Sequence, residues 1–363
     1  MINQITITNF RNHVSSRIKT DGCKNIIITG LNGAGKTAIL EAVSLLSGER
    51  GLRGVETQTL ARFDGDGGFS VFATTDDESD ICVFLNQNEL NRHAKIDNEN
   101  VALSELAKKL RIVWLTPRED RIFVESASER RTFFDHLVSS FDPSHIGRIS
   151  RLNKLLSERG GALKSNADDK WLDAIDNQIA STSIAIGAGR IRYASELNYF
   201  FSSGAVSVDG MIERLILDET LINAEKIYFE YLQNNRNLVG DKMVIDGAHK
   251  SDFGVFNNIL KLPANITSTG QQKKILIDLI LAHAKLIHIK TGKKPLILLD
   301  EAAAHLDDDA REKLFSELNT SNAQVWATGL DKNVFKNIPD ALFVTCQDGK
   351  ISNIVVGKEI QNA

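Results

Sequence analysis

Short apolar runs separated by polar turns fill the first third of the chain. The opening residues alternate between polar and apolar side chains, which is the pattern of a strand with one buried face. The later runs have the length and composition of strands bounded by turn residues. Together they predict a sheet with strands at residues 5–8, 26–28, 69–73, 81–85 and 111–115.

The pattern changes at Ser126, where helical periodicity begins. Ser126 and Glu129 have the spacing of a capping box, in which each residue satisfies a backbone N–H of the other. Apolar residues then recur at helical intervals, beginning with Phe133, Phe134, Leu137 and Val138. The periodicity predicts helices over residues 146–156, an interruption at Gly160 and Gly161, and further helices over 171–200 and 222–232.

Strands return beyond Met243. Apolar strands are predicted at residues 295–300 and 324–328, with a helix at 310–318 between them and a longer one at 275–289 before them. Strands at both ends and helices in the middle predict an α/β fold. We expect one α/β lobe built from residues 1–125 and 243–363, with an α-helical lobe inserted at 126–242. The helices are too short for a long coiled coil.

Composition restricts the class of protein. The 363 residues are 42% hydrophobic and 25% charged, and no apolar run approaches the roughly 20 residues of a membrane span. The first residues, from Met1, carry no basic leader, so a cytoplasmic protein without membrane contact is expected. Cys23, Cys82 and Cys346 lack metal-ligand spacing and are interpreted as packing residues.

The distribution of charge gives only a weak indication of a binding surface. The net charge is −4, but between Lys108 and Arg159 eleven Lys and Arg face seven Asp and Glu, a local +4. This region could be a solvated helical face or a surface that binds phosphates. The arginines of this region include Arg118, Arg121, Arg130, Arg131, Arg148 and Arg151.

The most specific motif follows the apolar strand at residues 25–29. Its sequence fits the phosphate-binding loop G-x-x-x-x-G-K-[ST], and a helical pattern follows, as this motif requires. The backbone N–H groups and the helix N-terminus suit a nucleotide triphosphate, whereas the alternative is a glycine turn that happens to carry Lys-Thr. Lys36 is expected to reach the phosphates and Thr37 to ligate Mg²⁺ beside ATP. The motif residues are Gly30, Leu31, Asn32, Gly33, Ala34, Gly35, Lys36 and Thr37.

A second motif has the pattern of a Walker B strand. Four apolar residues, 296–299, run directly into Asp300 and Glu301, as expected where a buried parallel strand ends at the edge of its sheet. Asp300 is expected to hold Mg²⁺, and Glu301 to act as general base toward the attacking water. An apolar strand that ends in two acids can also be purely structural.

A third motif lies at the start of the long helix. Residues 268–272 read Ser-Thr-Gly-Gln-Gln, which resembles the signature motif of ABC-type ATPases. Ser268, Gly270 and Gln271 at a helix N-terminus can form a second anion site, although Ser268 can also be a plain N-cap. In ABC-type architecture this half-site meets the phosphate-binding loop of a second copy, so ATP is expected to hold a two-fold homodimer together.

Two further residues are assigned by their place in this order. Asp307 follows the Walker B strand at the position of a D-loop and is expected to contact the second copy, or simply to start a helix. Thr328 ends the next strand, where many ABC ATPases carry a His that senses the γ-phosphate. A hydroxyl bonds more weakly there, so slow hydrolysis is expected.

With these motifs assembled, the chain resembles the RecF family, ATPases of recombination related to SMC proteins. Residues 8–13 look like the family's N-terminal Asn-Phe-Arg-Asn motif, which implies that Arg11 lies near the phosphates. Further stretches that are similar to the family are 114–120, 128–135, 247–252 and 268–272. The chain departs from the family pattern at Ala248, Lys250 and Glu301.

The resemblance implies a function in DNA repair and replication restart. The family's members bind gapped or junction DNA, both single-stranded and double-stranded, as ATP-bound dimers with weak DNA-stimulated ATPase activity. For this chain the resemblance implies DNA contact through arginines of the basic region, namely Arg118, Arg121, Arg130, Arg131, Arg148 and Arg151. They act with a RecR-like mediator so that recombinase is loaded on single-stranded DNA. Three other readings remain open: an ABC transporter's ATP-hydrolysing subunit, a non-hydrolysing ATP-dependent scaffold, and a P-loop small-molecule kinase.

Overall fold

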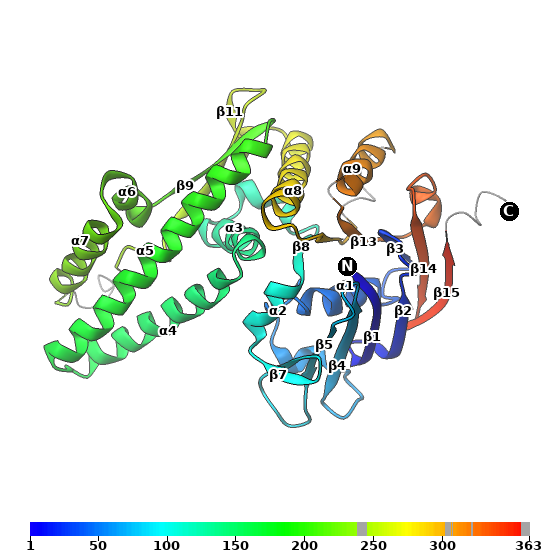
Figure 1. Ribbon diagram of the computed structural model, residues 1–363, viewed down its shortest axis with the longest axis horizontal. Coiled ribbons are helices and arrows are strands. Elements are labelled where there is room, and N and C mark those ends of the chain that lie inside the picture. The colour runs from blue at the N-terminus through cyan, green and yellow to red at the C-terminus, as the bar shows by residue number, and fades with distance from the viewer. Residues whose placement is uncertain (238–244, 302–305, 307, 321, 357–363) are drawn as a thin grey trace. The chain divides into compact units, whose positions relative to one another are not determined.

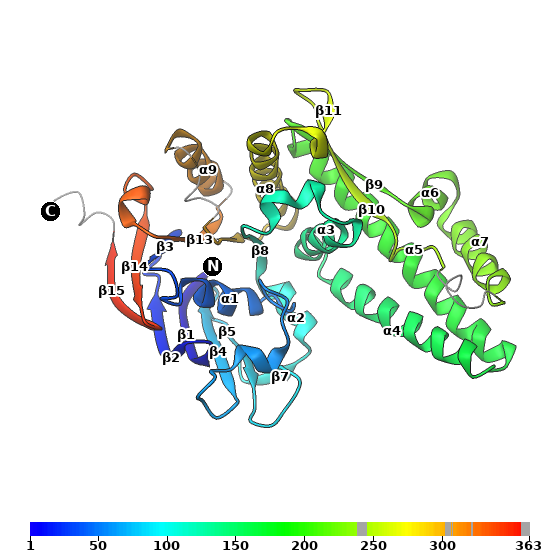
Figure 2. The same ribbon diagram turned by 180° about the vertical axis from the view of Figure 1, so that it is seen from behind.

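The computed structural model describes residues 1–237, 245–301, 306, 308–320 and 322–356. The chain forms two compact units. The first consists of residues 1–120 and 280–363, and the second of residues 121–279. Figures 1 and 2 show the chain from opposite sides.

A mainly parallel sheet forms one layer of the first unit. Its strand order is β15-β14-β3-β13-β12-β8, with β15 antiparallel to β14 and the other neighbours parallel. Strands β3, β12 and β13 are buried at every residue, because a parallel sheet is covered on both faces. The bounds are β3 (Asn25–Thr29), β8 (Arg111–Leu115), β12 (Pro295–Leu299), β13 (Gln324–Gly329), β14 (Ala341–Gln347) and β15 (Lys350–Val356).

An antiparallel sheet forms a second layer, in the order β2-β1-β4-β5-β6-β7. The predicted strands are confirmed, but the single sheet expected from them was wrong: 5–8, 69–73 and 81–85 lie in this sheet, and 26–28 and 111–115 in the parallel one. Periodicity within a strand does not identify its neighbours. The bounds are β1 (Ile2–Phe10), β2 (His13–Lys19), β4 (Phe69–Thr75), β5 (Asp80–Leu85), β6 (His93–Ile96) and β7 (Glu99–Val101).

Helix α1 (Lys36–Leu45) connects the two sheets, since it contacts strands of both. Nine of its ten residues are buried, which is the burial expected of a helix enclosed on several sides. Ile39, Leu40 and Val43 belong to a core that also includes residues of both sheets. The unit also contains α2 (Leu103–Lys109), α9 (Asp308–Thr320), and the short helices η1 (Thr57–Leu60) and η5 (Lys332–Phe335).

The second unit is mainly helical, as predicted. Ser126 caps α3 and accepts a hydrogen bond from the Glu129 backbone N–H. The predicted interruption at Gly160 and Gly161 was wrong, because α4 continues through both glycines. The buried pair of Arg159 with Asp176 of α5, 2.6 Å apart, fixes this turn of α4. Such packing offsets the cost of glycine in a helix, about 1 kcal/mol per residue. The bounds are α3 (Ala127–Phe141), α4 (Ser144–Lys164), α5 (Asp169–Phe200), α6 (Met211–Asp218) and α7 (Leu221–Asn234).

A small sheet in the order β11-β10-β9 completes the second unit. Strands β9 (Gly204–Asp209) and β10 (Asp252–Asn257) pair over their full length, and the latter also pairs with β11 (Leu262–Pro263). The boundary expected at residue 243 therefore differs from that of the compact unit, which ends at Leu279. The chain enters the first unit within α8 (Thr269–Thr291), which follows the short helix η4 (Ala264–Ile266).

Candidate nucleotide site

The loop after β3 holds the ammonium group of Lys36 inside its own turn. Lys36 is buried, and its Nζ donates to the carbonyl oxygens of Gly30 at 2.8 Å and Leu31 at 3.0 Å. The loop ends where α1 begins, so the helix N-terminus adds its partial positive charge. This strand–loop–helix arrangement is the geometry that a phosphate-binding loop requires.

Two glycines of the loop have no substitute. Gly30 has φ of 152°, and a Cβ there would lie 2.2 Å from the carbonyl oxygen of Cys346. Gly35 has φ of 108°, and its Cβ would lie 2.6 Å from His13 Nε2. Both the backbone conformation and the lack of space therefore demand glycine.

Three residues distant in sequence, His13, Cys346 and Gly349, form hydrogen bonds with the backbone of the loop. The Nε2 atom of His13 lies 3.0 Å from the Gly35 carbonyl oxygen, and its Nδ1 lies 2.8 Å from Ser16 Oγ. Gly349 N–H and Cys346 Sγ both donate to the Ala34 carbonyl oxygen. No local sequence pattern marks His13 and Cys346 as loop supports, because only the tertiary fold brings them there.

Burial shifts the pKa values of His13 and Cys346 so that both side chains favour their neutral forms. It lowers the pKa of His13 below its ordinary value of 6.5, against the opposing effect of hydrogen bonds to Gly35 and Gly349. It raises the pKa of the Cys346 thiol to about 11. A neutral imidazole fits its two partners, since Nε2–H donates to Gly35 and Nδ1 accepts from Ser16.

Thr37 and Asp300 meet at the carboxyl edge of the parallel sheet. Thr37 Oγ1 lies 3.0 and 3.1 Å from the two carboxylate oxygens of Asp300. Asp300 is buried, and its backbone N–H donates to the Leu115 carbonyl oxygen at 2.8 Å. The two motifs, 263 residues apart in sequence, therefore form one site.

The side chain of Thr328 forms hydrogen bonds with both Walker B acids. It is fully buried, its Oγ1 donates to Asp300 at 2.8 Å, and the same oxygen accepts from the Glu301 backbone N–H at 2.9 Å. These contacts give Thr328 a positioning role toward Asp300 and Glu301, and its contact with the γ-phosphate stays a prediction. Glu301 itself has φ of 55° and lines the pocket above the loop.

Hydroxyl and carboxylate oxygens are the donors that Mg²⁺ prefers, so Thr37 and Asp300 fit this ion. The described residues include no cluster of three His, Cys, Asp or Glu side chains that could hold a metal ion alone. Mg²⁺ usually takes one or two protein ligands together with phosphate oxygens and water.

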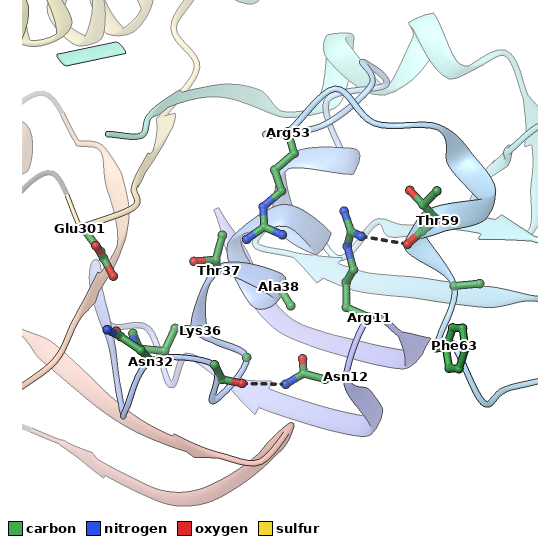
Figure 3. A pocket seen from close by; sticks show the side chains of 13 residues that line it. Arg11, Asn12, Asn32, Lys36, Thr37, Ala38, Arg53, Thr59, Phe63 and Glu301 are labelled. Carbon is green, nitrogen blue, oxygen red and sulfur yellow. Dashed lines mark hydrogen bonds between the residues drawn. The ribbon is translucent and has the colours of Figure 1, made fainter. Parts of the chain in front are cut away.

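A pocket extends from the loop toward Arg11, Arg53 and Phe63 (Figure 3). Arg11 Nε and Nη2 donate to the two oxygens of Glu41 at 2.8 and 2.9 Å, and Nη1 donates to the Thr59 carbonyl oxygen at 2.9 Å. Arg11 is therefore fixed at the pocket wall by a bidentate pair. Arg53 is a lining cation that the sequence analysis missed, since no motif marks the loop after α1.

The predicted signature residues lie at the exposed start of α8, in the other compact unit. Ser268, Gly270 and Gln271 are exposed, and a Cβ on Gly270 would meet no atom within 4 Å. Gln271 Oε1 accepts from the Ser268 backbone N–H at 3.2 Å, whereas the buried Gln272 donates to the Thr267 carbonyl oxygen at 2.9 Å. Asp307, the predicted D-loop residue, lies outside the described residues.

The candidate DNA-binding arginines differ in their surroundings. Arg130 forms a bidentate pair with Asp252, and Arg131 donates to the Ser251 carbonyl oxygen at 2.8 Å. Three of the six, Arg118, Arg121 and Arg151, are exposed, whereas Arg130, Arg131 and Arg148 are half-buried. Arg148 also pairs with Asp142, at 2.8 Å.

No helix in the described part of the chain has the length and apolar character needed to cross a membrane. The three cysteines are all free thiols.

The two-layered fold and the joined motifs define the class: an ABC-type P-loop ATPase head with an inserted helical unit. Residues 1–353 match the family described as RecF/RecN/SMC N-terminal domain. The chain belongs to this family, and within it to the RecF branch.

Several relatives match over nearly their whole length, and each is called DNA replication and repair protein RecF. The protein from Allorhizobium ampelinum is 35% identical, with 97% of this chain and 98% of the relative covered. The protein from Mesorhizobium japonicum is 34% identical, with 96% and 97% covered. The protein from Brucella abortus is 33% identical, with 97% and 96% covered.

Solved structures show the same fold. The structure described as the recombination mediator protein RecF–ATP in the RecFOR pathway has a TM-score of 0.79 at 24% identity, covering 97% of this chain and 98% of that one. An Smc head domain from Pyrococcus furiosus, bound to the C-terminal domain of ScpA, has a TM-score of 0.54 at 14% identity, covering 99% and 98%.

Proposed function

We propose that this protein binds ATP and Mg²⁺ in the pocket above the loop and hydrolyses the nucleotide slowly. Lys36 and the loop N–H groups would hold the β- and γ-phosphates, and Thr37 and Asp300 would hold the ion, which supplies charge neutralisation to the phosphates. Glu301 would accept a proton from the attacking water. Arg11 and Arg53 line the same pocket and suit phosphate oxygens, and the aromatic ring of Phe63 suits the base.

The site as described is half of an ABC-type site. Among the described residues, those that line its phosphate pocket belong to the first unit, whereas the exposed N-terminus of α8 offers Ser268 Oγ and the N–H groups of its first turn for an anion. In the proposed dimer, Ser268, Gly270 and Gln271 of one copy complete the pocket of the other. ATP then contributes its full set of contacts only in the closed dimer, and Asp307 would lie at the same interface.

The function of the closed dimer is proposed to be that of a clamp on gapped or junction DNA during repair and replication restart. The relatives named above are DNA replication and repair proteins, and a structural neighbour is described as a recombination mediator of the RecFOR pathway. A RecR-like mediator is the corresponding partner, and loading of recombinase on single-stranded DNA is the outcome. The protein would act in the cytoplasm, where the DNA is.

DNA and ATP would strengthen each other's binding. If DNA prefers the closed dimer, it must increase ATP affinity by the same factor by which ATP increases DNA affinity. Hydrolysis removes the γ-phosphate bridge and opens the clamp, so DNA would stimulate the weak ATPase by favouring the closed state. The contacts are expected to be phosphate contacts, with a salt slope of about −0.9 per phosphate engaged.

The observation that carries this proposal is the meeting of Thr37 and Asp300 beside the Lys36 loop. Lys36→Ala should abolish ATP binding and ATP-dependent dimerisation together, as measured by nucleotide titration and by molar mass in solution. An unchanged ATP-dependent dimer in that variant would refute the loop assignment. Retention of gapped duplex DNA at several salt concentrations, with and without ATP, tests the clamp; no retention under any condition would favour a transporter subunit or a scaffold.

A further inference from the structure

A charge-poor stretch with exposed apolar side chains precedes the signature helix. Between Asp252 and Lys273 the only charged residue is Lys261. Within this stretch Ile259 is 70% exposed and Ile266 is 63% exposed. Other exposed apolar residues of the stretch are Phe256, Leu260, Leu262 and Pro263. Apolar side chains concentrated in this way usually mark a surface that another molecule covers.

The stretch is ordered by its own hydrogen bonds. Asn257 Oδ1 accepts from the backbone N–H groups of Ile259 at 2.9 Å and Leu260 at 3.0 Å, which fixes the tip between β10 and β11. Phe253 and Val255 of β10 face the interior, so the alternation of the strand turns Phe256 outward. We call residues 256–266 the apolar hairpin (Figures 1 and 2).

The apolar hairpin leads directly into the predicted signature. The Thr267 backbone N–H and Oγ1 both donate to the Ala264 carbonyl oxygen, at 3.1 and 2.8 Å. Gln272 Nε2 in turn donates to Thr267, which ties the first turn of α8 to the end of the hairpin. Ile266 and Ser268 are therefore two exposed residues of one hydrogen-bonded segment.

Exposed apolar side chains also follow the ends of two neighbouring strands, β3 and β13, where Gly329 pairs with Thr29. Leu31, inside the phosphate-binding loop, is 81% exposed, and Leu330, directly after β13, is 61% exposed. Neither side chain contributes to the hydrophobic core, because both are mostly exposed to solvent. The cores of subunit interfaces are typically poor in charge and rich in such apolar side chains.

We propose that the apolar hairpin is the hydrophobic anchor of the ATP-bound dimer and packs against Leu31 and Leu330 of a second copy. The inference rests on the proposed function, in which the α8 N-terminus of one copy covers the loop of the other. Two-fold symmetry forms the contact twice. The γ-phosphate determines whether the dimer forms, and the apolar hairpin adds buried apolar surface that stabilises it.

The anchor can be tested by variants that place a charge on it. Ile259→Asp and Ile266→Asp should each weaken ATPγS-dependent dimerisation by about tenfold or more, because a central apolar contact is replaced by a buried charge. Nucleotide binding by the isolated copy, measured at low protein concentration, should not change, since the pocket lies in the other unit. The control is Ile222→Asp, because Ile222 is 82% exposed in the first turn of α7, where a carboxylate suits the helix.

The possible outcomes distinguish failure of the proposed hairpin contact from failure of the proposed ATP-dependent dimer. If the parent and both hairpin variants dimerise equally with ATPγS, the anchor is refuted while the proposed function stands. If the parent does not dimerise, both fail. A photo-reactive amino acid at position 259, mixed with an isotope-labelled second copy, should attach to labelled peptides that contain Leu31 or Leu330; attachment to neither would also overturn the proposal.

Discussion

The hydroxyl of Thr328 lies 2.8 Å from Oδ1 of Asp300 and donates to it from the neighbouring strand. The same oxygen accepts the Glu301 backbone N–H, so one buried side chain positions both Walker B acids. In a parallel sheet the ends of adjacent strands lie side by side, which is why Thr328 and Asp300 meet.

Removal of this hydroxyl should impair hydrolysis more than nucleotide binding. Thr328→Val keeps the volume but leaves Asp300 and the Glu301 N–H with one partner fewer, at a cost of about 1–3 kcal/mol in stability. We expect Mg²⁺ affinity and the hydrolysis rate to fall by about 10- to 100-fold. Thr328→Ser, which keeps the hydroxyl, should retain both; a Val variant with parental turnover would contradict the positioning role.

The Arg11–Glu41 pair should contribute to stability as well as to the pocket. Glu41 is 1% exposed, so Arg11→Ala leaves a buried carboxylate without its cation, whereas Arg11→Ala combined with Glu41→Gln does not. The single variant is expected to lose about 1–3 kcal/mol in the free energy of unfolding, and the double variant less. Urea unfolding of the single and double variants measures the difference. Equal losses would mean that Glu41 does not depend on Arg11.

Stability should decrease as the solution becomes acidic below about pH 6.5. Burial lowers the pKa of His13 below 6.5 and acts in the same direction on the pKa of His249. Below this pH the unfolded chain takes up protons that the folded chain resists, so unfolding is favoured and stability rises with pH across the window. Unfolding free energies at pH 5.5 and 7.5 should differ less in His13→Gln than in the parent. An identical pH dependence would remove His13 from this account.

The arginines of the second unit should separate into structural and DNA-binding groups. Arg130→Ala is expected to lower stability, because it leaves Asp252 without the bidentate partner described above. Arg121→Gln combined with Arg151→Gln should leave stability unchanged and reduce the salt slope of DNA binding by up to about 2, at −0.9 per lost phosphate contact. An unchanged slope would exclude these two residues from the DNA surface.

Local pattern predicted most of the elements and the order of the motifs. The capping box at Ser126, the buried strand before Asp300 and the glycines around Lys36 were readable because each depends on neighbours in sequence. The division into two sheets and the continuation of α4 through Gly160 were not, because pairing and packing with distant segments decide them.

The same limit applies to the site. The phosphate loop and its acids could be found by motif, but their supports, His13, Cys346 and Arg53, belong to no local pattern. Thr328 was identified at the correct strand end, whereas its partner could be found only from the register of β12 and β13.

Complementation between two inactive variants tests the central claim most directly, that the pocket of one copy is completed by the signature of another. Lys36→Ala disables the loop, and Gly270→Asp places a carboxylate in open space at the α8 N-terminus, where it repels phosphate without a clash. Each variant alone should be inactive. A mixed dimer contains one intact composite site, formed by the loop of the Gly270→Asp copy and the signature of the Lys36→Ala copy, whereas neither homodimer contains one. An equal mixture should therefore recover ATP hydrolysis, up to about one half of the parental rate if only mixed dimers form. A mixture as inactive as its components would contradict the shared site.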